Sequence, residues 1–392
     1  MSLVLAALSL AIWLYLVLAR GRFWLGREND DALVPPGVAP PPAWPAIVAI
    51  IPARNEADLI GATIGSLLAQ NYPGAFSILV VDDGSADGTA EAARRAAAQA
   101  GAAARLTVLG GSEPPPGWTG KLWAMRTGFA AVQARSEPPD FALFTDADIH
   151  YAAPDALTRL VRGALARGTV LTSLMVRLRC DSAAERLLVP AFVFFFAKLY
   201  PFAWVNDPAR RIGAAAGGSV LVRRQALVEA GGIEAIRAAL IDDCALGALM
   251  KTRGPIWLGL TRRVESLRPY PAFDDIRRMV VRSAYAQLLY SPLLLAGTVA
   301  GLCLTYFVPP ATALFAQGPA RWVGASAWAL MALSFAPILR LYRRSPLWGV
   351  ALPGIAAIYA GFTLESALAH ARGRGGAWKG RFQAAAGTAR DV

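Results

Sequence analysis

The stretch SILVVDDGS, residues 77–85, decides the fold of this chain. A short apolar run, Ser77 to Val81, has the composition of a buried strand. Asp82 and Asp83 follow it directly, and Gly84 then permits a tight turn. The next residues, 86–100, are rich in alanine and favour a helix. A buried strand, a polar turn at its carboxyl end and a helix make up half of a βαβ unit.

The same alternation continues on both sides of this stretch. Strands are predicted at 46–51, 106–109 and 141–145, and helices at 56–70 and 121–132. Such alternation predicts an α/β domain with a mostly parallel sheet. In sheets of this kind the ligand binds beyond the carboxyl ends of the strands. The acidic residues at 82–83 and 146–148 are expected at that edge.

Asp82 and Asp83 are the first candidate binding residues. Two adjacent carboxylates at a strand end repel each other, so we expect a ligand or cation that offsets the repulsion. Carboxylate oxygens can accept hydrogen bonds from a nucleobase N–H or from ribose hydroxyls. Asp87, a few residues further on, is interpreted as a turn residue only, because aspartate commonly caps helices and forms turns.

Asp146 and Asp148 form a second acidic group, in the motif FTDAD at 144–148. Alternate residues at a strand end direct both carboxylates toward one region. Hard oxygen ligands favour Mg²⁺ or Mn²⁺. An ion held there would bridge the two phosphates of a nucleotide sugar and neutralise the leaving diphosphate. The motif therefore predicts a divalent cofactor and a nucleotide-sugar donor.

Asp242 and Asp243 open an amphipathic helix in the motif IDDCALG at 241–247. Negative charge at a helix N-terminus complements the helix dipole, which is sufficient to explain one of the two. The chain has only 2 histidines, His150 and His370, so a histidine base is nearly excluded. A carboxylate of this pair is therefore the candidate to remove a proton from an acceptor hydroxyl.

Composition places the domain at a membrane. Hydrophobic residues make up 55% of the chain and the mean hydropathy is +0.41, so part of the apolar content is expected in lipid. The net charge of +12 favours an anionic membrane surface or a phosphorylated substrate. The arginines are scattered and no nucleic-acid motif is present, so no nucleic-acid partner is expected. The 3 cysteines fit no zinc or disulfide pattern.

Residues 1–20 are predicted to be an uncleaved transmembrane anchor. An uncharged apolar run precedes Arg20, Arg22 and Arg27, whereas the alternative, a cleaved signal peptide, would carry its charges before the run. The positive-inside rule then places these arginines and the catalytic domain in the cytoplasm. Residues 21–45 are expected to be a proline-rich linker, whose part with six prolines, 35–45, is stiff and extended.

Further membrane segments are predicted near the C-terminus, within residues 286–370. The apolar runs are 288–308, 322–339 and 347–364, and a basic tail follows at 371–392. The arginines before and after the third run should both be cytoplasmic, which one full crossing forbids. Either that run is re-entrant or the tail breaks the rule.

Two more helices are expected at the lipid surface. One is the aromatic segment 191–204, for which a buried core helix is the alternative, and the other is the arginine-rich segment 273–287.

Taken in order, these motifs resemble those of family 2 glycosyltransferases, which have the GT-A fold. The matching stretches are IPARNE at 51–56, VDDGS at 81–85, GKLWAM at 120–125, TDAD at 145–148, GGS at 217–219 and DD at 242–243. Within the family, the chain is most similar to bacterial hopene-associated glycosyltransferases, which themselves resemble ceramide glucosyltransferases. The anchor, the proline-rich linker, the apolar C-terminal runs and the tail WKGR at 378–381 carry this likeness.

The resemblance implies a GT-A, Rossmann-like nucleotide-sugar domain over residues 46–285, in a multi-pass protein of the bacterial inner membrane. It implies an inverting transfer of a sugar from a nucleotide-diphosphate donor to the hydroxyl of a membrane lipid, with a hopanoid-like acceptor. The implied donor-binding residues are Pro52, Glu56, Asp82, Asp83, Lys121 and Asp146. The implied metal ligands are Asp146 and Asp148. The implied catalytic residues are Asp243 as the base, Asp242 and Arg282.

Arg282 is what remains of a Q-x-x-R-W motif that many relatives carry, since residues 279–283 read MVVRS. This departure argues against a processive polysaccharide synthase. Two alternatives stay open: a polyprenyl-phosphate glycosyltransferase, which uses a phosphate acceptor, and a non-catalytic nucleotide-binding membrane protein.

Overall fold

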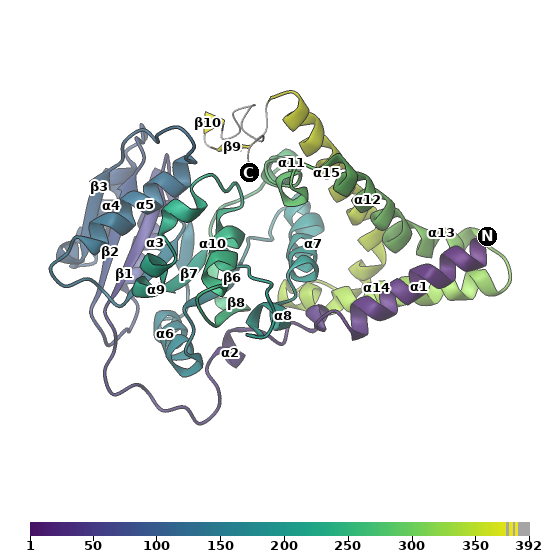
Figure 1. Ribbon diagram of the computed structural model, residues 1–392, viewed down its shortest axis with the longest axis horizontal. Helices are drawn as coiled ribbons and strands as arrows, with labels where there is room; N and C mark the ends of the chain where they lie inside the picture. The colour runs from purple at the N-terminus through teal and green to yellow at the C-terminus, as the bar shows by residue number, and fades with distance from the viewer. Residues whose placement is uncertain (374–375, 379–380, 383–392) are drawn as a thin grey trace.

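The computed structural model describes residues 1–373, 376–378 and 381–382, and joins a mixed α/β domain to a set of apolar helices (Figure 1). One eight-stranded sheet has the order β3-β2-β1-β4-β7-β6-β8-β5. The strands are β1 (Ile47–Ala53), β2 (Phe76–Asp82), β3 (Leu106–Gly110), β4 (Phe141–Thr145), β5 (Ile149–Tyr151), β6 (Leu171–Arg177), β7 (Ser219–Arg223) and β8 (Ile256–Ser266). The predicted parallel arrangement is confirmed for β1 to β4, whereas β7 runs antiparallel to both β4 and β6.

Helices cover both faces of the sheet, and this explains the continuous apolar sequence of β1. Every residue of β1 is buried, as is typical of a parallel strand packed on both sides. Val48 and Ile50 belong to the core under α5 (Gly120–Gln133), and Ile47, Ala49 and Ile51 to the core under α3 (Ala57–Leu68) and α4 (Thr89–Gln99). The other helices of the domain are α6 (Ala156–Arg167), α9 (Arg224–Glu229) and α10 (Asp242–Lys251).

The linker segment 21–45 is folded onto the α/β domain at its start. It contains the short helices η1 (Phe23–Leu25) and α2 (Asp30–Leu33) before the prolines begin. Asp30 is buried, and its Oδ2 accepts a hydrogen bond of 2.5 Å from the Thr261 hydroxyl of β8. Leu33 is also buried. The segment is therefore tied to the domain by a buried polar contact and an apolar one.

The aromatic segment predicted at 191–204 lies in two helices, α7 (Ala183–Leu199) and α8 (Phe202–Asn206), with Pro201 between them. Phe194 is fully buried, and its ring packs against Phe23 and Phe335. Phe192 and Phe196 are only partly buried. Helix α7 thus connects the α/β domain to the apolar helices through one face, while another face borders a cavity.

The helix predicted over 273–287 is shorter than expected. α11 covers Phe273–Val281, and a separate turn, η4, covers Ala286–Leu288. Leu289 and Tyr290 then have left-handed backbone with φ of 52° and 54°. Two such residues in succession cannot continue a right-handed helix, so α11 is separated from the first C-terminal apolar helix by a sharp bend.

Among the described residues, three C-terminal stretches are long and apolar enough to cross a membrane: Pro292–Phe315, Pro319–Leu341 and Pro346–Ala371. The first contains α12 (Pro292–Leu302), a π-helical turn η5 (Cys303–Phe307) and α13 (Val308–Phe315). The second is α14, and the third contains η6 (Pro346–Ala351) and α15 (Leu352–Ala371). The predicted anchor is α1 (Ser2–Leu18), which is apolar, shorter than these three, and packs along α13 and α14.

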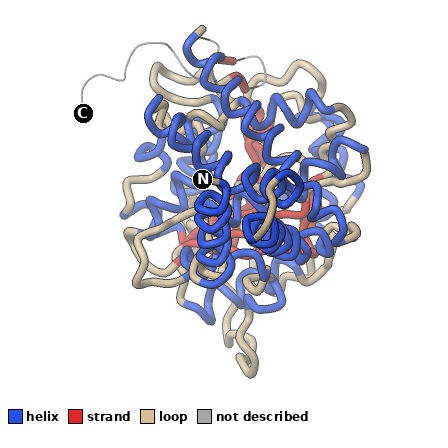
Figure 2. The backbone as a smooth tube through the Cα atoms, turned by 90° about the vertical axis from the view of Figure 1, so that its right-hand side faces the viewer, coloured by secondary structure: helices blue, strands red, loops and turns tan. Residues whose placement is uncertain are grey.

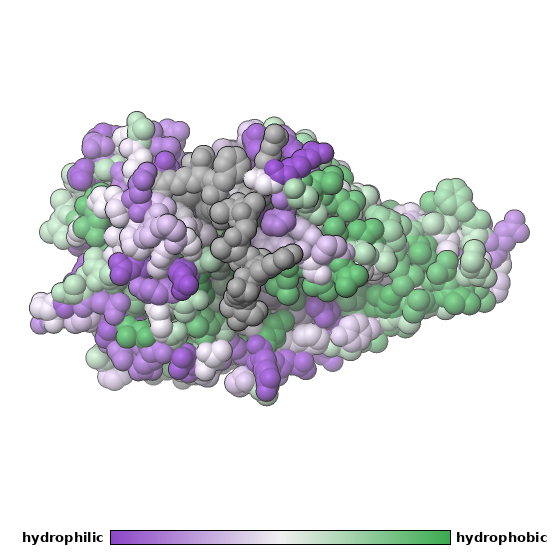
Figure 3. All heavy atoms as spheres, turned by 45° about the horizontal axis from the view of Figure 1, so that its top comes forward, coloured by the Kyte–Doolittle hydropathy of each residue, from purple (hydrophilic) through white to green (hydrophobic). Residues whose placement is uncertain are grey.

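The apolar helices form one end of the molecule. Figure 2 shows this end toward the viewer, with the N-terminus in front and the sheet behind the helices. Figure 3 shows that apolar side chains cover the surface there, whereas hydrophilic side chains gather over the α/β domain. Such a division of the surface suits a domain that stands against a lipid bilayer.

A proline follows the π-helical turn and changes the hydrogen bonding within it. Pro309 has no N–H, so the carbonyl of Thr305, four residues earlier, lacks its usual helical partner. The indole Nε1 of Trp13 donates to that carbonyl at 2.8 Å. Trp13 is fully buried. Helix α1 is therefore joined to the C-terminal helices by a buried hydrogen bond as well as by packing.

The third apolar stretch doubles back on itself. Its first part, η6, runs back along α14: Trp328 Nε1 donates to the carbonyl of Val350 at 3.2 Å, and a Cβ at Gly349 would lie 2.4 Å from the carbonyl oxygen of Ala332. Its second part, α15, then reaches η4 and α11. The Ser366 hydroxyl accepts the N–H of Tyr285 at 3.0 Å, so α15 ends beside the catalytic domain.

The described part of the tail pairs β9 (Ala377–Trp378) with β10 (Arg381–Phe382). The middle residues of the WKGR motif, 379 and 380, lie outside the described residues, as do 374–375 and 383–392.

Candidate active site

A cavity of about 560 Å³ lies at the carboxyl ends of β1 and β4, where the sequence placed the ligand. It brings together most of the predicted site residues. Those that line it are Pro52, Glu56, Lys121, Asp146, Asp148, Asp242, Asp243 and Arg282. Asp82 and Asp83 are not among its lining residues.

Lys121 joins two of the acidic groups. It lies in the first turn of α5, which Thr119 caps by accepting the N–H of Leu122 at 3.3 Å. The Nζ atom is 2.9 Å from Oδ1 of Asp146 and 3.0 Å from Oδ2 of Asp242. Burial by itself would lower the pKa of Lys121, but the two carboxylates raise it above its ordinary value. The ammonium group therefore stays charged beside them.

Asp243 is held by backbone donors. Its Oδ2 accepts the N–H of Gly217 at 2.9 Å, and its Oδ1 accepts the N–H of Cys244 at 2.7 Å. Burial and then the negative charge of Asp242 raise the pKa of Asp243 to about 6, against the opposing effect of Lys121. The carboxylate is thus ionised at neutral pH, and its pKa is close enough to neutrality for it to accept a proton.

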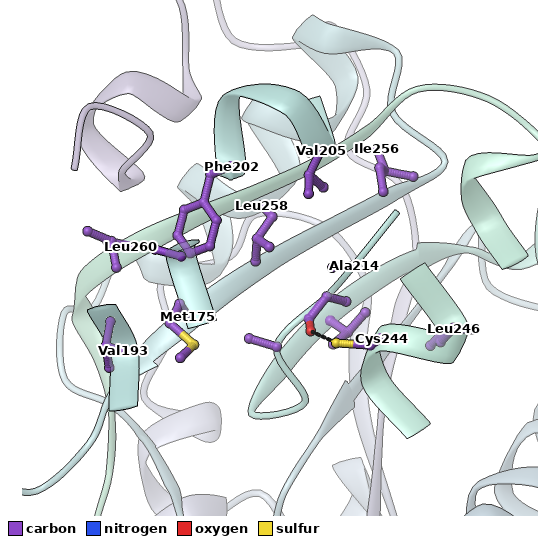
Figure 4. Close-up of a cluster of buried hydrophobic side chains, with 14 of the residues drawn as sticks. Met175, Val193, Phe202, Val205, Ala214, Cys244, Leu246, Ile256, Leu258 and Leu260 are labelled. Atoms are coloured by element: carbon purple, nitrogen blue, oxygen red, sulfur yellow. Dashed lines mark hydrogen bonds between the residues drawn. The ribbon is translucent and has the colours of Figure 1, made fainter. Parts of the chain in front are cut away.

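The hydrophobic core fixes α10 and with it both aspartates. Cys244 and Leu246 of α10 lie in one core cluster with Ala214 and with Ile256 and Leu258 of β8 (Figure 4). The Cys244 thiol donates to the carbonyl of Ala215 at 3.7 Å. Cys244 therefore packs in the core. Asp243, the residue before it, lines the cavity.

Arg268 is a site residue that the sequence analysis missed. Its Nη2 donates to both carboxylate oxygens of Glu56 at 2.6 and 2.7 Å, and its Nε donates to Oδ2 of Asp148 at 3.1 Å. The segment that carries it is held by α7, since Glu185 accepts the N–H of Tyr270 at 2.6 Å. The available signal was an arginine directly after a long strand.

The acidic pair of the FTDAD motif fits a divalent ion that arrives with its ligand. Among the described residues, the Asp148 side chain contacts Arg268 and, at 2.9 Å, the Ser266 hydroxyl, and both contacts end on Oδ2. Asp146 contacts Lys121 through Oδ1. Oδ1 of Asp148 and Oδ2 of Asp146 do not take part in these contacts. In the described part of the chain no group of three or more His, Cys, Asp or Glu side chains could hold an ion. Phosphate and water oxygens would have to complete the shell, as is usual for Mg²⁺.

Asp82 and Asp83 have structural partners that offset their repulsion. Oδ1 of Asp82 accepts the N–H of Ser85 at 2.9 Å, which closes the turn after β2. Asp83 is buried and forms an ion pair with Arg54 at 3.5 Å. Arg54 itself lines the cavity, so Asp83 supports the cavity wall through this arginine. A direct contact of either aspartate with a donor stays a prediction.

A second cavity, of about 490 Å³, opens from the same carboxylates, and we call it the apolar chamber. It shares with the first cavity Lys121, Asp146, Asp242, Asp243 and Arg282. Its other walls are largely apolar, and α7, α12 and α15 each contribute to them. They include Phe192, Phe195 and Phe196 of α7, Thr298 and Leu302 of α12, and Ala356, Tyr359 and Thr363 of α15. The chamber therefore extends from Asp243 into the membrane-type helices.

Comparison with solved structures shows which fold this is. The mannosyltransferase PcManGT from Pyrobaculum calidifontis, in complex with GDP-Man and Mn2+, is 20% identical, covers 95% of this chain and 99% of its own, and superposes with a TM-score of 0.55. The mannosyl-3-phosphoglycerate synthase from Rubrobacter xylanophilus is 22% identical over 62% of this chain and 73% of its own, with a TM-score of 0.37. Comparison with curated protein sequences found no match.

The fold is that of the GT-A glycosyltransferases. Residues 48–229 match the family described as Glycosyl transferase family 2. The matched residues form a family 2 glycosyltransferase domain, as their motifs predicted, and the chain is a glycosyltransferase.

Proposed function

We propose that the protein transfers a sugar, with inversion, from a nucleotide-diphosphate sugar to the hydroxyl of a membrane lipid. The observation that carries the proposal is the shared wall of the two cavities. Asp243 borders both the polar cavity, which suits a donor, and the apolar chamber, which suits the body of a lipid. A water-soluble acceptor would need no apolar chamber that reaches α12 and α15.

In the polar cavity, Glu56 and the Asp83–Arg54 pair would bind the nucleoside part of the donor. Lys121 and Arg282 would face the diphosphate. Asp146 and Asp148 would hold a Mg²⁺ or Mn²⁺ ion, which when bound neutralises the leaving diphosphate. All of these groups except Asp83 line the cavity, and Lys121 is already fixed between Asp146 and Asp242.

In the reaction, the acceptor oxygen would form a bond to the anomeric carbon while the bond from that carbon to the diphosphate oxygen breaks. Asp243 would take the hydroxyl proton. Its position suits this role because Gly217 and Cys244 fix the carboxylate at the junction of the two cavities. Asp242, bonded to Lys121, would keep that cation in place beside the donor phosphates.

The acceptor that we propose is a hopanoid-like amphiphile, with its hydroxyl near Asp243 and its apolar body in the chamber. The enzyme would act at the cytoplasmic face of a bacterial inner membrane. Arg278 of α11, which is largely exposed, would face the anionic lipid surface.

The test uses the purified full-length protein, a panel of nucleotide sugars and a bacterial lipid extract. Mass spectrometry should find a lipid that has gained one hexose or hexosamine unit. The Asp243→Asn variant should lose this product, with a rate lower by about 10² to 10⁴, while its affinity for the donor stays nearly unchanged. If the variant turns over normally, or if a soluble sugar is the better acceptor, the proposal is wrong.

A further inference from the structure

Lys198 brings an amino group to the wall of the apolar chamber. Its ammonium group donates to the Tyr306 hydroxyl at 2.7 Å, and it lies over the rings of Phe195 and Tyr306 at 5.4 and 4.7 Å from their centroids. In the part of the chain that the structure describes, no ion pair joins Lys198 to a carboxylate. Nothing in the reaction outlined above uses this group.

A second cation lies beside it. Arg20, just after α1, donates from Nε to the carbonyl of Lys198 at 2.8 Å and from Nη2 to that of Leu199 at 3.3 Å. These contacts satisfy the end of α7 but bring no negative charge. Burial and then the positive charge of Arg20 lower the pKa of Lys198 to about 7. A nearby anion would favour the charged form of Lys198 and so offset both effects.

The position of Lys198 is determined by an irregular part of the fold. Tyr306, its hydrogen-bond partner, lies within the π-helical turn Cys303–Phe307 and is fully buried. That turn brings the tyrosine hydroxyl to α7, and such turns often occur at functional sites. The two remaining N–H groups of the ammonium are left for a ligand in the chamber, which it lines.

We propose that Lys198 binds the phosphate of a lipid whose apolar chains lie in the chamber. The phosphate supplies the missing negative charge, and charge-assisted hydrogen bonds to it are stronger than neutral ones. The rings of Phe195 and Tyr306 lie beside the ammonium. This inference rests on the proposed function only in that it places a lipid in the same chamber. The phosphate belongs either to the acceptor itself or to a membrane phospholipid that binds beside it.

Binding can be measured without any transfer reaction. The full-length protein in neutral detergent is titrated with dodecyl phosphate and with 1-dodecanol, at high salt so that surface charges are screened. Wild type should bind dodecyl phosphate about tenfold more tightly than the alcohol, the size expected for one charge-assisted hydrogen bond. Lys198→Met should abolish this preference and Lys198→Arg should keep it.

A matched control is Lys251→Met. Lys251 is also a partly buried lysine, bonded to the carbonyls of Val205 and Asp207 at 2.5 and 2.8 Å, but it does not line the chamber. It should keep the preference for phosphate. Equal binding of the two ligands by wild type, or a phosphate preference that survives in folded Lys198→Met, would overturn the inference. So would competition by inorganic phosphate at equal concentration, because the chains would then contribute nothing.

A further arm identifies the source of the phosphate. With a labelled donor, glycosylated dodecyl phosphate identifies the acceptor as the phosphate lipid. Faster glycosylation of a hydroxyl lipid in the presence of dodecyl phosphate identifies a co-bound phospholipid. Absence of all transfer with intact binding would contradict the proposed function and leave the phosphate site standing.

Discussion

At the residue scale, the Asp242–Asp243 pair makes the rate depend on pH. Asp243 must be ionised to accept a proton, so kcat/KM should fall by about tenfold per unit as the pH drops below about 6. Asp242→Asn should move this acid limb to lower pH. The reason is that the charge of Asp242 helps to raise the pKa of Asp243, and its loss also frees Lys121 to stabilise the ionised form. A pH profile of both proteins between 4.5 and 8 checks this, and a limb that moves toward neutrality would contradict it.

Arg268 should matter for donor binding because it lines the cavity and contacts two of the cavity's carboxylates. Arg268→Gln leaves Glu56 and Asp148 without the cation that joins them. We expect binding of a nucleoside diphosphate, measured by calorimetry, and of Mn²⁺, measured by electron paramagnetic resonance, each to weaken by about tenfold or more. Arg263→Gln is the control, because Arg263 pairs with Asp31 away from the cavity. If both variants bind like wild type, Arg268 is not a positioning residue.

The sequence predicted the acidic residues better than their partners. Motif order placed Asp146, Asp148 and Asp243 at strand and helix ends, and all three line one cavity. Arg268 was not predicted as a site residue, because its position depends on the pairing of β8 with β5 and β6 at the far side of the sheet. No local pattern encodes that pairing. Asp82 was assigned to a ligand, whereas a turn N–H accounts for one of its oxygens.

At the scale of single elements, α7 offers a test of the lipid site. Phe192 borders both cavities and is only partly buried, so Phe192→Ser should leave the fold intact and raise KM for the lipid acceptor. Slow hydrolysis of the donor by water should continue at the wild-type rate. Normal kinetics with the lipid, in a variant shown to be folded, would exclude the chamber as the acceptor site.

Phe194→Ser is the contrasting variant in the same helix. Phe194 is fully buried against Phe23 and Phe335 and does not line the chamber. Removing its ring leaves a cavity and should destabilise the protein by about 3–5 kcal/mol. A thermal unfolding curve should therefore shift strongly for this variant and little for Phe192→Ser. Equal shifts would mean that the two faces of α7 do not differ as described.

Elements of regular pattern were predicted well, and irregular ones were not. β4 was placed at its observed limits, 141–145, because it is a continuous apolar run that stops at an aspartate. The break after α11 was missed, since Leu289 and Tyr290 are neither Gly nor Asn and give no sign of left-handed backbone. The π-helical turn was also missed, although Pro309 lies two residues after it.

At the scale of the whole molecule, the doubled-back third stretch accounts for the charge conflict in the C-terminal region. η6 starts after Arg343 and Arg344 and runs back along α14, and α15 returns to α11 before Arg372. Both clusters of arginine would then lie on the side of the catalytic domain, as the positive-inside rule requires. A full crossing would instead separate them. We therefore expect a re-entrant stretch, with α12–α13 and α14 as a pair of crossings.

Cysteine labelling in intact cells tests this topology. In a background with Cys180, Cys244 and Cys303 replaced by Ala, single cysteines are introduced as Ala39→Cys in the linker, Gln317→Cys, Ser345→Cys and Arg372→Cys. An impermeant thiol reagent should label position 317 from outside, because it lies between α13 and α14 at the end farthest from the domain. Positions 39, 345 and 372 should react only after the membrane is opened. Labelling of position 372 from outside, with position 345 protected, would show that the third stretch crosses the membrane fully. Labelling of position 39 from outside would place the catalytic domain outside the cell, away from a cytoplasmic donor.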